Sequence, residues 1–273
     1  MQHTVSANQL SSLSGAQVLR WSGIAWFTVA AAGQLAFIAF ILFFYGVSII
    51  AGDFAAWNNK PLIEGYVAGD LVGNIMFAIH VMFAAVMTLS GLLQLIPFVR
   101  SRMPLLHRYS GRIFLIMACT LAIGGLWLTW GRGSHLSVIG ANAISLNALL
   151  ILVCALMTVR FAVHRKIADH QRWAMRLFMV ANGVWFMRIA IMSWIVVAQG
   201  PVGMNRTMSG PTDIVIVFGC YLIPLALYEL YWRAKQSGSE ALKVTAACFV
   251  LVATGITAIG VFATSAFMWL PYI

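Results

Sequence analysis

The sequence has very little charge for its length. Only 9% of its 273 residues are Asp, Glu, Lys or Arg, whereas 62% are hydrophobic. A water-soluble domain cannot bury that much apolar surface, so we expect the lipid bilayer to be the solvent of this chain. In the bilayer a helix satisfies its own backbone groups, whereas an open sheet does not. The composition therefore predicts an all-α, polytopic transmembrane bundle.

Sequence motifs of soluble enzymes are also missing. No Walker loop, GxGxxG, HExxH or GxSxG motif stands in a usable context, and no spacing of Cys and His residues suits a metal ion. The four cysteines, Cys119, Cys154, Cys220 and Cys248, lie in apolar stretches and form no CxxC pair. We expect these thiols to be buried packing residues, so we predict no metal site.

The N-terminus does not have the pattern of a cleavable signal peptide. Residues 1–19 are polar, Arg20 is the first Lys or Arg, and the apolar run that follows is too long for a signal sequence. We expect residues 1–20 to form a polar cytoplasmic tail and residues 21–273 to form a single transmembrane domain.

Seven apolar segments are long enough to cross a bilayer, which takes about 20 helical residues. They are residues 22–50, 71–98, 111–131, 143–163, 173–199, 214–233 and 244–270. Because the connections between them are short, we expect one bundle of about seven helices in a multi-pass protein of the cell membrane.

Basic residues fall mostly on one side of this predicted topology. Thirteen lie on that side: Arg20, Arg100, Arg102, Arg108, Arg112, Arg160, Arg165, Lys166, Arg172, Arg176, Arg233, Lys235 and Lys243. Three lie on the other side: Lys60, Arg132 and Arg206. Cytoplasmic loops are enriched in Lys and Arg, so we predict a cytoplasmic N-terminus and an external C-terminus. The net charge of +10 is then explained by the membrane, and we expect no nucleic-acid partner.

Two basic corners on the predicted cytoplasmic side resemble each other. "PLLHRYSGRIF" (residues 104–114) has His107 followed by Arg108 and Arg112, and "ADHQRWAMRLF" (168–178) has His170 followed by Arg172 and Arg176. We expect each histidine to precede a helix and each arginine pair to share one helix face. This pattern suggests a weak internal repeat of a two-helix unit.

The basic corners are candidate anion-binding sites. A helix N-terminus and paired arginines both favour an anion, such as a lipid phosphate, a substrate carboxylate or a haem propionate. The alternative is that the arginines Arg108, Arg112, Arg172 and Arg176 only set the topology. That alternative explains His107 and His170 less well, because a histidine is a poor topology signal at neutral pH.

Two ionisable residues, His80 and Arg188, fall deep within predicted helices. For His80 we consider a hydrogen bond to another helix, a haem or redox role, and a proton relay. For Arg188 we consider a backbone carbonyl or an acid, Asp70 or Asp213, as its partner, or a ligand role.

Further polar residues complete the predicted interior. His80, Met87 and Gln94 recur every seven residues and share one stripe, which with Asn147 and Asn182 predicts a polar interior along the bundle axis. Glu229 and Arg233 stand four apart on one helix, so we expect them to pair.

The order of these motifs resembles a known family. A histidine in the second helix, then "SGLLQLIPFVR", "LLHRYSGRIF" and "DHQRWAMRLF", is similar to bacterial predicted membrane proteins of the domain of unknown function 2306. The family pattern maps to His80, Gly91 with Gln94, His107 with Arg108, Gly111 and Arg112, and His170 with Trp173 and Arg176. Ala174 stands where that pattern often has Met. The resemblance covers about residues 70–195 and implies a bacterial inner-membrane protein, but no settled activity.

The chain also resembles, less closely, membrane b-type cytochromes. The two-haem kind needs four histidines inside the bundle, and here only His80 lies there. One haem b between His107 and His170, or one on His80, remains a candidate. Three functions are therefore open: a redox protein that uses haem b or a quinone, an anion or lipid binder or carrier, and a non-catalytic accessory subunit.

Overall fold

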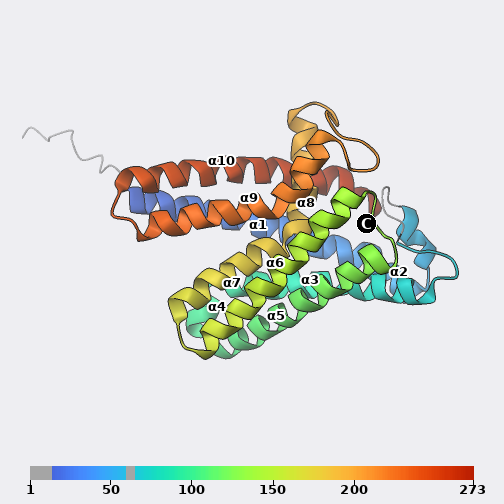
Figure 1. Ribbon diagram of the computed structural model, residues 1–273, viewed down its shortest axis with the longest axis horizontal. Helices are drawn as coiled ribbons and strands as arrows, with labels where there is room; N and C mark the ends of the chain where they lie inside the picture. Colours follow the sequence, from blue (N-terminus) through green and yellow to red (C-terminus); the bar gives the residue numbers. More distant parts are fainter. Residues whose placement is uncertain (1–13, 60–64) are drawn as a thin grey trace, which may run out of the picture.

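The protein is helical throughout the part that the computed structural model describes, residues 14–59 and 65–273, with no strand in those ranges (Figure 1). Most of the predicted N-terminal tail, together with Lys60 and Glu64, lies outside the described residues. The long helices are α1 (Gly15–Phe40), α3 (Leu71–Leu95), α5 (Pro104–Leu126), α6 (Val138–Val163), α7 (Ile167–Ala181), α8 (Gly183–Val197), α9 (Pro211–Gln236) and α10 (Glu240–Thr264).

Short helical pieces extend or connect these helices. They are α2 (Val47–Ala51), α4 (Pro97–Arg102), the π-helical turns Ile41–Gly46, Trp127–Gly131 and Ser265–Trp269, and the 3-10 turns Phe54–Asn59 and Leu270–Tyr272. Within the described ranges, six helical runs are long and apolar enough to span a bilayer, and the pair α7–α8 makes a seventh candidate span. The prediction of an all-α, multi-pass bundle is confirmed.

The fifth predicted span is a broken helix rather than a straight one. Residues 173–199 fall in α7 and α8, which meet at a bend of 54° with Asn182 between them. Asn182 is buried, accepts a hydrogen bond at its Oδ1 from Gln34 Nε2 (3.1 Å), and donates from its Nδ2 to the Phe178 carbonyl (2.9 Å). The Asn182 side chain thus adds a second donor to the Phe178 carbonyl, which also accepts from the Asn182 backbone N–H at 3.3 Å.

Several helices begin earlier than hydropathy predicts. The side chain of Ser137 accepts from Gly140 N at the start of α6, and Pro104 occupies the first turn of α5. The Ser137 side chain gives a hydrogen-bond acceptor to a backbone N–H of the first turn, which has none within the helix. Pro104 has no backbone N–H and therefore needs no acceptor there. His107 and His170 were predicted to precede their helices. The structure instead places them in the first turns of α5 and α7.

The helices form two groups. Helices α3, α5, α6 and α7 pack together in chain order, and α1 packs along α10 beside α9 (Figure 1). The broken span connects the groups, because α7 packs mainly on α6, whereas α8 packs on α10 and α9. Cys154 and Cys220 are buried in this core and Cys119 is half-buried, but Cys248 is exposed on the surface of α10, so its predicted burial is wrong.

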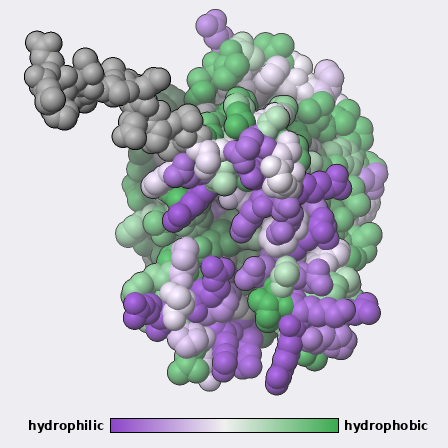
Figure 2. Space-filling view, turned by 90° about the vertical axis from the view of Figure 1, so that its left-hand side faces the viewer, coloured by the Kyte–Doolittle hydropathy of each residue, from purple (hydrophilic) through white to green (hydrophobic). Residues whose placement is uncertain are grey.

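The two ends of the bundle differ in polarity. The start of α1, the α3–α5, α6–α7 and α9–α10 connections, and their Lys and Arg residues lie at one end, here called the basic end (Figure 1). Hydrophilic side chains gather over this face, as Figure 2 shows. The C-terminus lies at the other end, here called the C-terminal end (Figure 1). Gly15 and the C-terminus therefore lie at opposite ends, as an odd number of spans requires.

Candidate functional site

The α3–α5 hairpin is locked together by residues of the first basic corner. Gln94 of α3 donates from Nε2 to the His107 carbonyl (3.0 Å) and to Ser110 Oγ (2.6 Å) of α5. A Cβ on Gly111 would lie 2.9 Å from Gln94 Oε1, and one on Gly91 would lie 2.9 Å from the Phe114 ring. Gln94 and both glycines therefore let two helices approach closely. Gln94 does not line a polar channel.

The two corner histidines lie near each other at the basic end. His107 and His170 are half-buried, and their imidazoles are close enough to interact electrostatically. His107 Nδ1 is enclosed without a hydrogen-bond partner, whereas His170 Nδ1 lies 3.0 Å from the Thr158 carbonyl of α6. A carbonyl can only accept, so in this contact Nδ1 of His170 is the donor.

The arginines of the second corner are bound by an acid from another helix. Arg172 Nη2 donates to Glu229 Oε2, and Arg176 Nε donates to Glu229 Oε1 at 2.7 Å. Arg176 also stacks over the Trp173 ring, 4.1 Å from its centroid. The predicted pair between Glu229 and Arg233 is wrong, because the carboxylate faces α7 across the bundle instead of along its own helix.

The arginines of the first corner, in contrast, are exposed. Arg108 and Arg112 point away from the helix core, and Arg112 lies over the Tyr109 ring. No ion pair joins Arg108 or Arg112 to an acid in residues 14–59 or 65–273. The two corners are therefore not equivalent: both arginine charges of the first corner are unpaired, whereas Glu229 balances one of the two arginine charges of the second.

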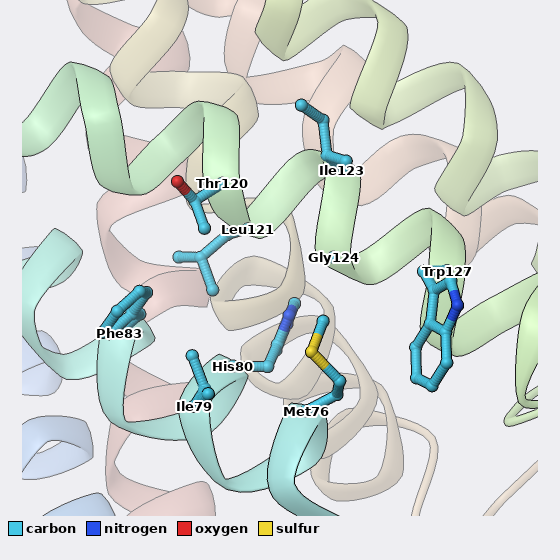
Figure 3. A pocket seen from close by; sticks show the side chains of 9 residues that line it. All are labelled: Met76, Ile79, His80, Phe83, Thr120, Leu121, Ile123, Gly124 and Trp127. Carbon is cyan, nitrogen blue, oxygen red and sulfur yellow. The ribbon is translucent and has the colours of Figure 1, made fainter. Parts of the chain in front are cut away.

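The histidine of the second predicted span, His80, lies in an apolar groove between α3 and α5 (Figure 3). The groove has a volume of about 270 Å³. Its lining comprises Met76, Ile79, His80, Phe83, Thr120, Leu121, Ile123, Gly124 and Trp127. Ile79 and Ile123 at its rim are 40% and 60% exposed, so the groove opens on the membrane-facing surface.

The imidazole of His80 has no hydrogen-bond partner among the residues that the structure describes. It points from α3 toward α5, where it lies against a glycine pair (Figure 3). A Cβ on Gly124 would lie 3.7 Å from His80 Nδ1, and one on Gly125 would lie 3.5 Å from its Cε1. The predicted hydrogen bond to a neighbouring helix is thus absent. The imidazole instead faces Gly124 and Gly125, which have no side chains to bond with it.

Arg188, the other charged residue predicted within a helix, has no acid partner among the described residues. Its Nη1 donates to the Val184 carbonyl one turn back (3.0 Å), and its guanidinium lies over the Phe37 ring at 5.4 Å. Asp70 binds Arg132 instead, and Asp213 accepts from backbone groups of a loop. Of the predicted partners for Arg188, the carbonyl is confirmed and the acids are wrong.

Most of the groove around His80 was not predicted from the sequence. Thr120, Gly124 and Trp127 of the α5 run were not singled out, although "TLAIGGLW" contains the only signal, a glycine pair in an apolar stretch. Trp127 begins a π-helical turn, and such turns occur often at functional sites. The stripe of His80, Met87 and Gln94 was predicted to face the bundle axis, but His80 and Gln94 contact α5.

Comparison with known proteins identifies the family. The model of a family described as predicted membrane protein, domain of unknown function 2306, matches residues 77–232, which is more than half of the chain. The chain belongs to this family. The match includes His80, both basic corners and the Glu229 clasp, defined as Glu229 with Arg172 and Arg176. No curated protein and no solved structure matches this member of the 2306 family.

Proposed function

We propose that this membrane protein binds a lipid-soluble molecule of the quinone class in the groove at His80. One observation supports the proposal above all others: an imidazole without a partner faces an apolar groove that opens on the membrane-facing surface. A polar group in hydrocarbon is costly unless it is hydrogen bonded. A ligand that enters from the membrane and accepts or donates one hydrogen bond removes that cost.

The chemistry of the groove suits a quinone headgroup. A neutral imidazole offers one N–H donor and one acceptor, so it can bind a quinone carbonyl or a quinol hydroxyl. The apolar side chains of Phe83, Leu121 and Trp127 suit a flat ring, and an isoprenoid tail would extend into the lipid.

Binding of a short-chain ubiquinone analogue to the purified protein tests this proposal. The His80→Leu variant removes the hydrogen bond, so we expect about tenfold weaker binding, whereas His80→Gln keeps a donor and an acceptor and loses less. Quenching of tryptophan fluorescence gives the dissociation constant, because Trp127 lines the groove. His164→Leu makes the same chemical change at an exposed histidine and is the control. Equal affinity of His80→Leu and wild type would refute the proposal.

A haem b between His107 and His170 is a second candidate, supported by the hydrogen bond of His170. Histidine ligands of metals commonly donate the other ring nitrogen to a carbonyl, as His170 Nδ1 does to Thr158. The enclosed, unpartnered Nδ1 of His107 on α5 would supply a second nitrogen to hold the haem. Each nitrogen would have to come within about 2 Å of the iron, so both rings would turn toward one point.

The visible spectrum of the purified protein tests the haem candidate. We expect a Soret band with sharp alpha and beta bands after reduction, lost in His107→Ala and in His170→Ala but kept in His164→Ala. A colourless wild-type protein that is folded and monodisperse excludes this candidate and leaves the quinone proposal untouched.

We also propose that the protein lies in the bacterial inner membrane with its basic end in the cytoplasm. The excess of Lys and Arg at that end supports this orientation. The exposed guanidinium groups of Arg108 and Arg112 then face anionic lipid headgroups. The attraction stabilises membrane binding by about 1 kcal/mol for each basic residue.

A further inference from the structure

A second pocket lies at the break between α7 and α8, separate from the groove at His80. It has a volume of about 100 Å³ and is enclosed by α6, α8 and α9. Asn147 of α6, Gly183 at the start of α8 and Tyr221 of α9 meet in it. His135 and Ser137, from the loop before α6, line it on the side of the C-terminal end.

Asn147 carries an unsatisfied polar atom in this pocket. The residue is 8% exposed, and its Oδ1 accepts no hydrogen bond from the described residues. Nearby Tyr221 is not a donor to it, because the Tyr221 hydroxyl bonds to the Ala143 carbonyl (3.2 Å). Buried amide oxygens almost always have a donor, so the donor at Asn147 is expected to come from a molecule other than the protein.

The break in the helix brings α8 unusually close to Asn147. A Cβ on Gly183 would lie 2.9 Å from Asn147 Nδ2 and 3.2 Å from the Tyr221 Cβ, closer than side chains normally pack. Only glycine therefore fits at the first residue of α8 without displacing Asn147. Interrupted helices that line a cavity are a recurring form of binding site in membrane proteins.

The lining determines the charge and the size of a ligand. The pocket has hydroxyl, amide and imidazole groups but no Asp, Glu, Lys or Arg, and several apolar side chains complete its wall: Leu136, Ala143, Ile144, Val184, Met187, Met208 and Val217. We propose that the pocket binds a small uncharged solute with an N–H or O–H donor beside an apolar group, a primary amide or a simple alcohol. Its volume admits a few non-hydrogen atoms, since one water takes about 30 Å³.

Protection of Cys220 by acetamide tests this proposal. Cys220 is buried but lines the pocket, so its thiol reports on access. In full-length protein with Cys119, Cys154 and Cys248 changed to Ser, we expect a small methanethiosulfonate reagent to label Cys220, measured by intact mass. Acetamide in the bath should slow this labelling several-fold. The same reagent should label a chain that keeps only Cys154 at least tenfold more slowly, because Cys154 is buried and lines neither pocket.

Variants of the lining decide whether the amide of Asn147 is responsible. Asn147→Leu, with nearly the same volume, should abolish the protection by acetamide. Ile151→Leu, a change at a buried residue of α6 that lines neither pocket, should keep it. If Asn147→Leu does not fold, Gly183→Ala replaces it, because its methyl group would press on Asn147. Labelling of Cys220 as slow as that of Cys154, or equal protection in wild type and Asn147→Leu, would overturn the proposal. Neither result bears on the quinone groove.

Discussion

Polar residues within the bundle fall into two groups: those with a hydrogen-bond partner in the protein and those without one. Membrane-embedded hydroxyls such as Thr88 and Thr158 donate to a carbonyl one turn back. His80 and the Oδ1 of Asn147 have no such partner among the described residues, and both residues line a cavity. Since an unpaired polar group costs stability in an apolar medium, these two positions are where a ligand gains most from binding.

The ion pair of Asp70 and Arg132 gives a prediction at the scale of a residue. Asp70 caps α3 through Gly73 N (2.8 Å) and accepts from Arg132 Nε (2.8 Å). The backbone bond to Gly73, and then the bond to Arg132, hold the pKa of the Asp70 carboxyl below its usual value of 3.8. A lowered pKa stabilises the fold above the ordinary value, and this stabilisation disappears as the pH falls through the pKa of the folded state.

We therefore expect Asp70→Asn to melt at a lower temperature than wild type near neutral pH, with the difference shrinking below about pH 4. Asn still caps the helix, so the difference reports the bond to Arg132. Thermal unfolding in detergent, followed by intrinsic fluorescence, measures it. A melting-temperature difference that does not change with pH would contradict this account.

At the scale of helices, the Glu229 clasp holds the two helix groups together at the basic half of the bundle. Its carboxylate comes from α9, and both guanidinium groups come from α7. Glu229 is 20% exposed, Arg172 is 31% exposed and Arg176 is 19% exposed. Water therefore screens the charges of these three side chains only in part. Charge-assisted bonds in such surroundings are stronger than those on the surface.

Glu229→Gln leaves two guanidinium groups without a counter-charge, so we expect it to destabilise the fold by about 1–3 kcal/mol. The further change Arg176→Gln should recover part of this loss, which a double-mutant cycle in detergent measures. Glu240→Gln serves as the control, because Glu240 is 59% exposed beside Lys243 and the loss of its charge should destabilise the fold much less. Equal losses for Glu229→Gln and Glu240→Gln would show that the clasp adds nothing.

At the scale of the whole molecule, the bend at Asn182 makes one span belong to both helix groups. The first half of this span, α7, packs on α6, and the second half, α8, packs on α10. The pocket at Asn147 lies at this junction, whereas the groove at His80 lies within one group, between α3 and α5. The two cavities therefore lie in different parts of the helix packing, one within a helix group and one where the two groups meet.

The orientation in the membrane is a prediction for the whole molecule. A cysteine placed at exposed Ser101, at the basic end, should react with an impermeant thiol reagent only from the cytoplasmic side. A cysteine at Asn205, in the loop before α9, should react only from outside. The native cysteines are changed to Ser beforehand, and intact cells are compared with inverted vesicles. The reverse pattern would overturn the orientation.

The sequence by itself determined that the chain is embedded in a lipid bilayer, that it is helical, and that it has about seven spans. These properties depend on the length and hydropathy of local segments. It also indicated His80, the basic corners and the family. The tertiary structure alone decided the partners. Glu229 pairs with α7 rather than with Arg233, Gln94 binds α5, and His80 faces a groove rather than another polar residue. Partner choice depends on which helix faces lie together and on where a span bends, and neither is encoded by the spacing of residues within one segment.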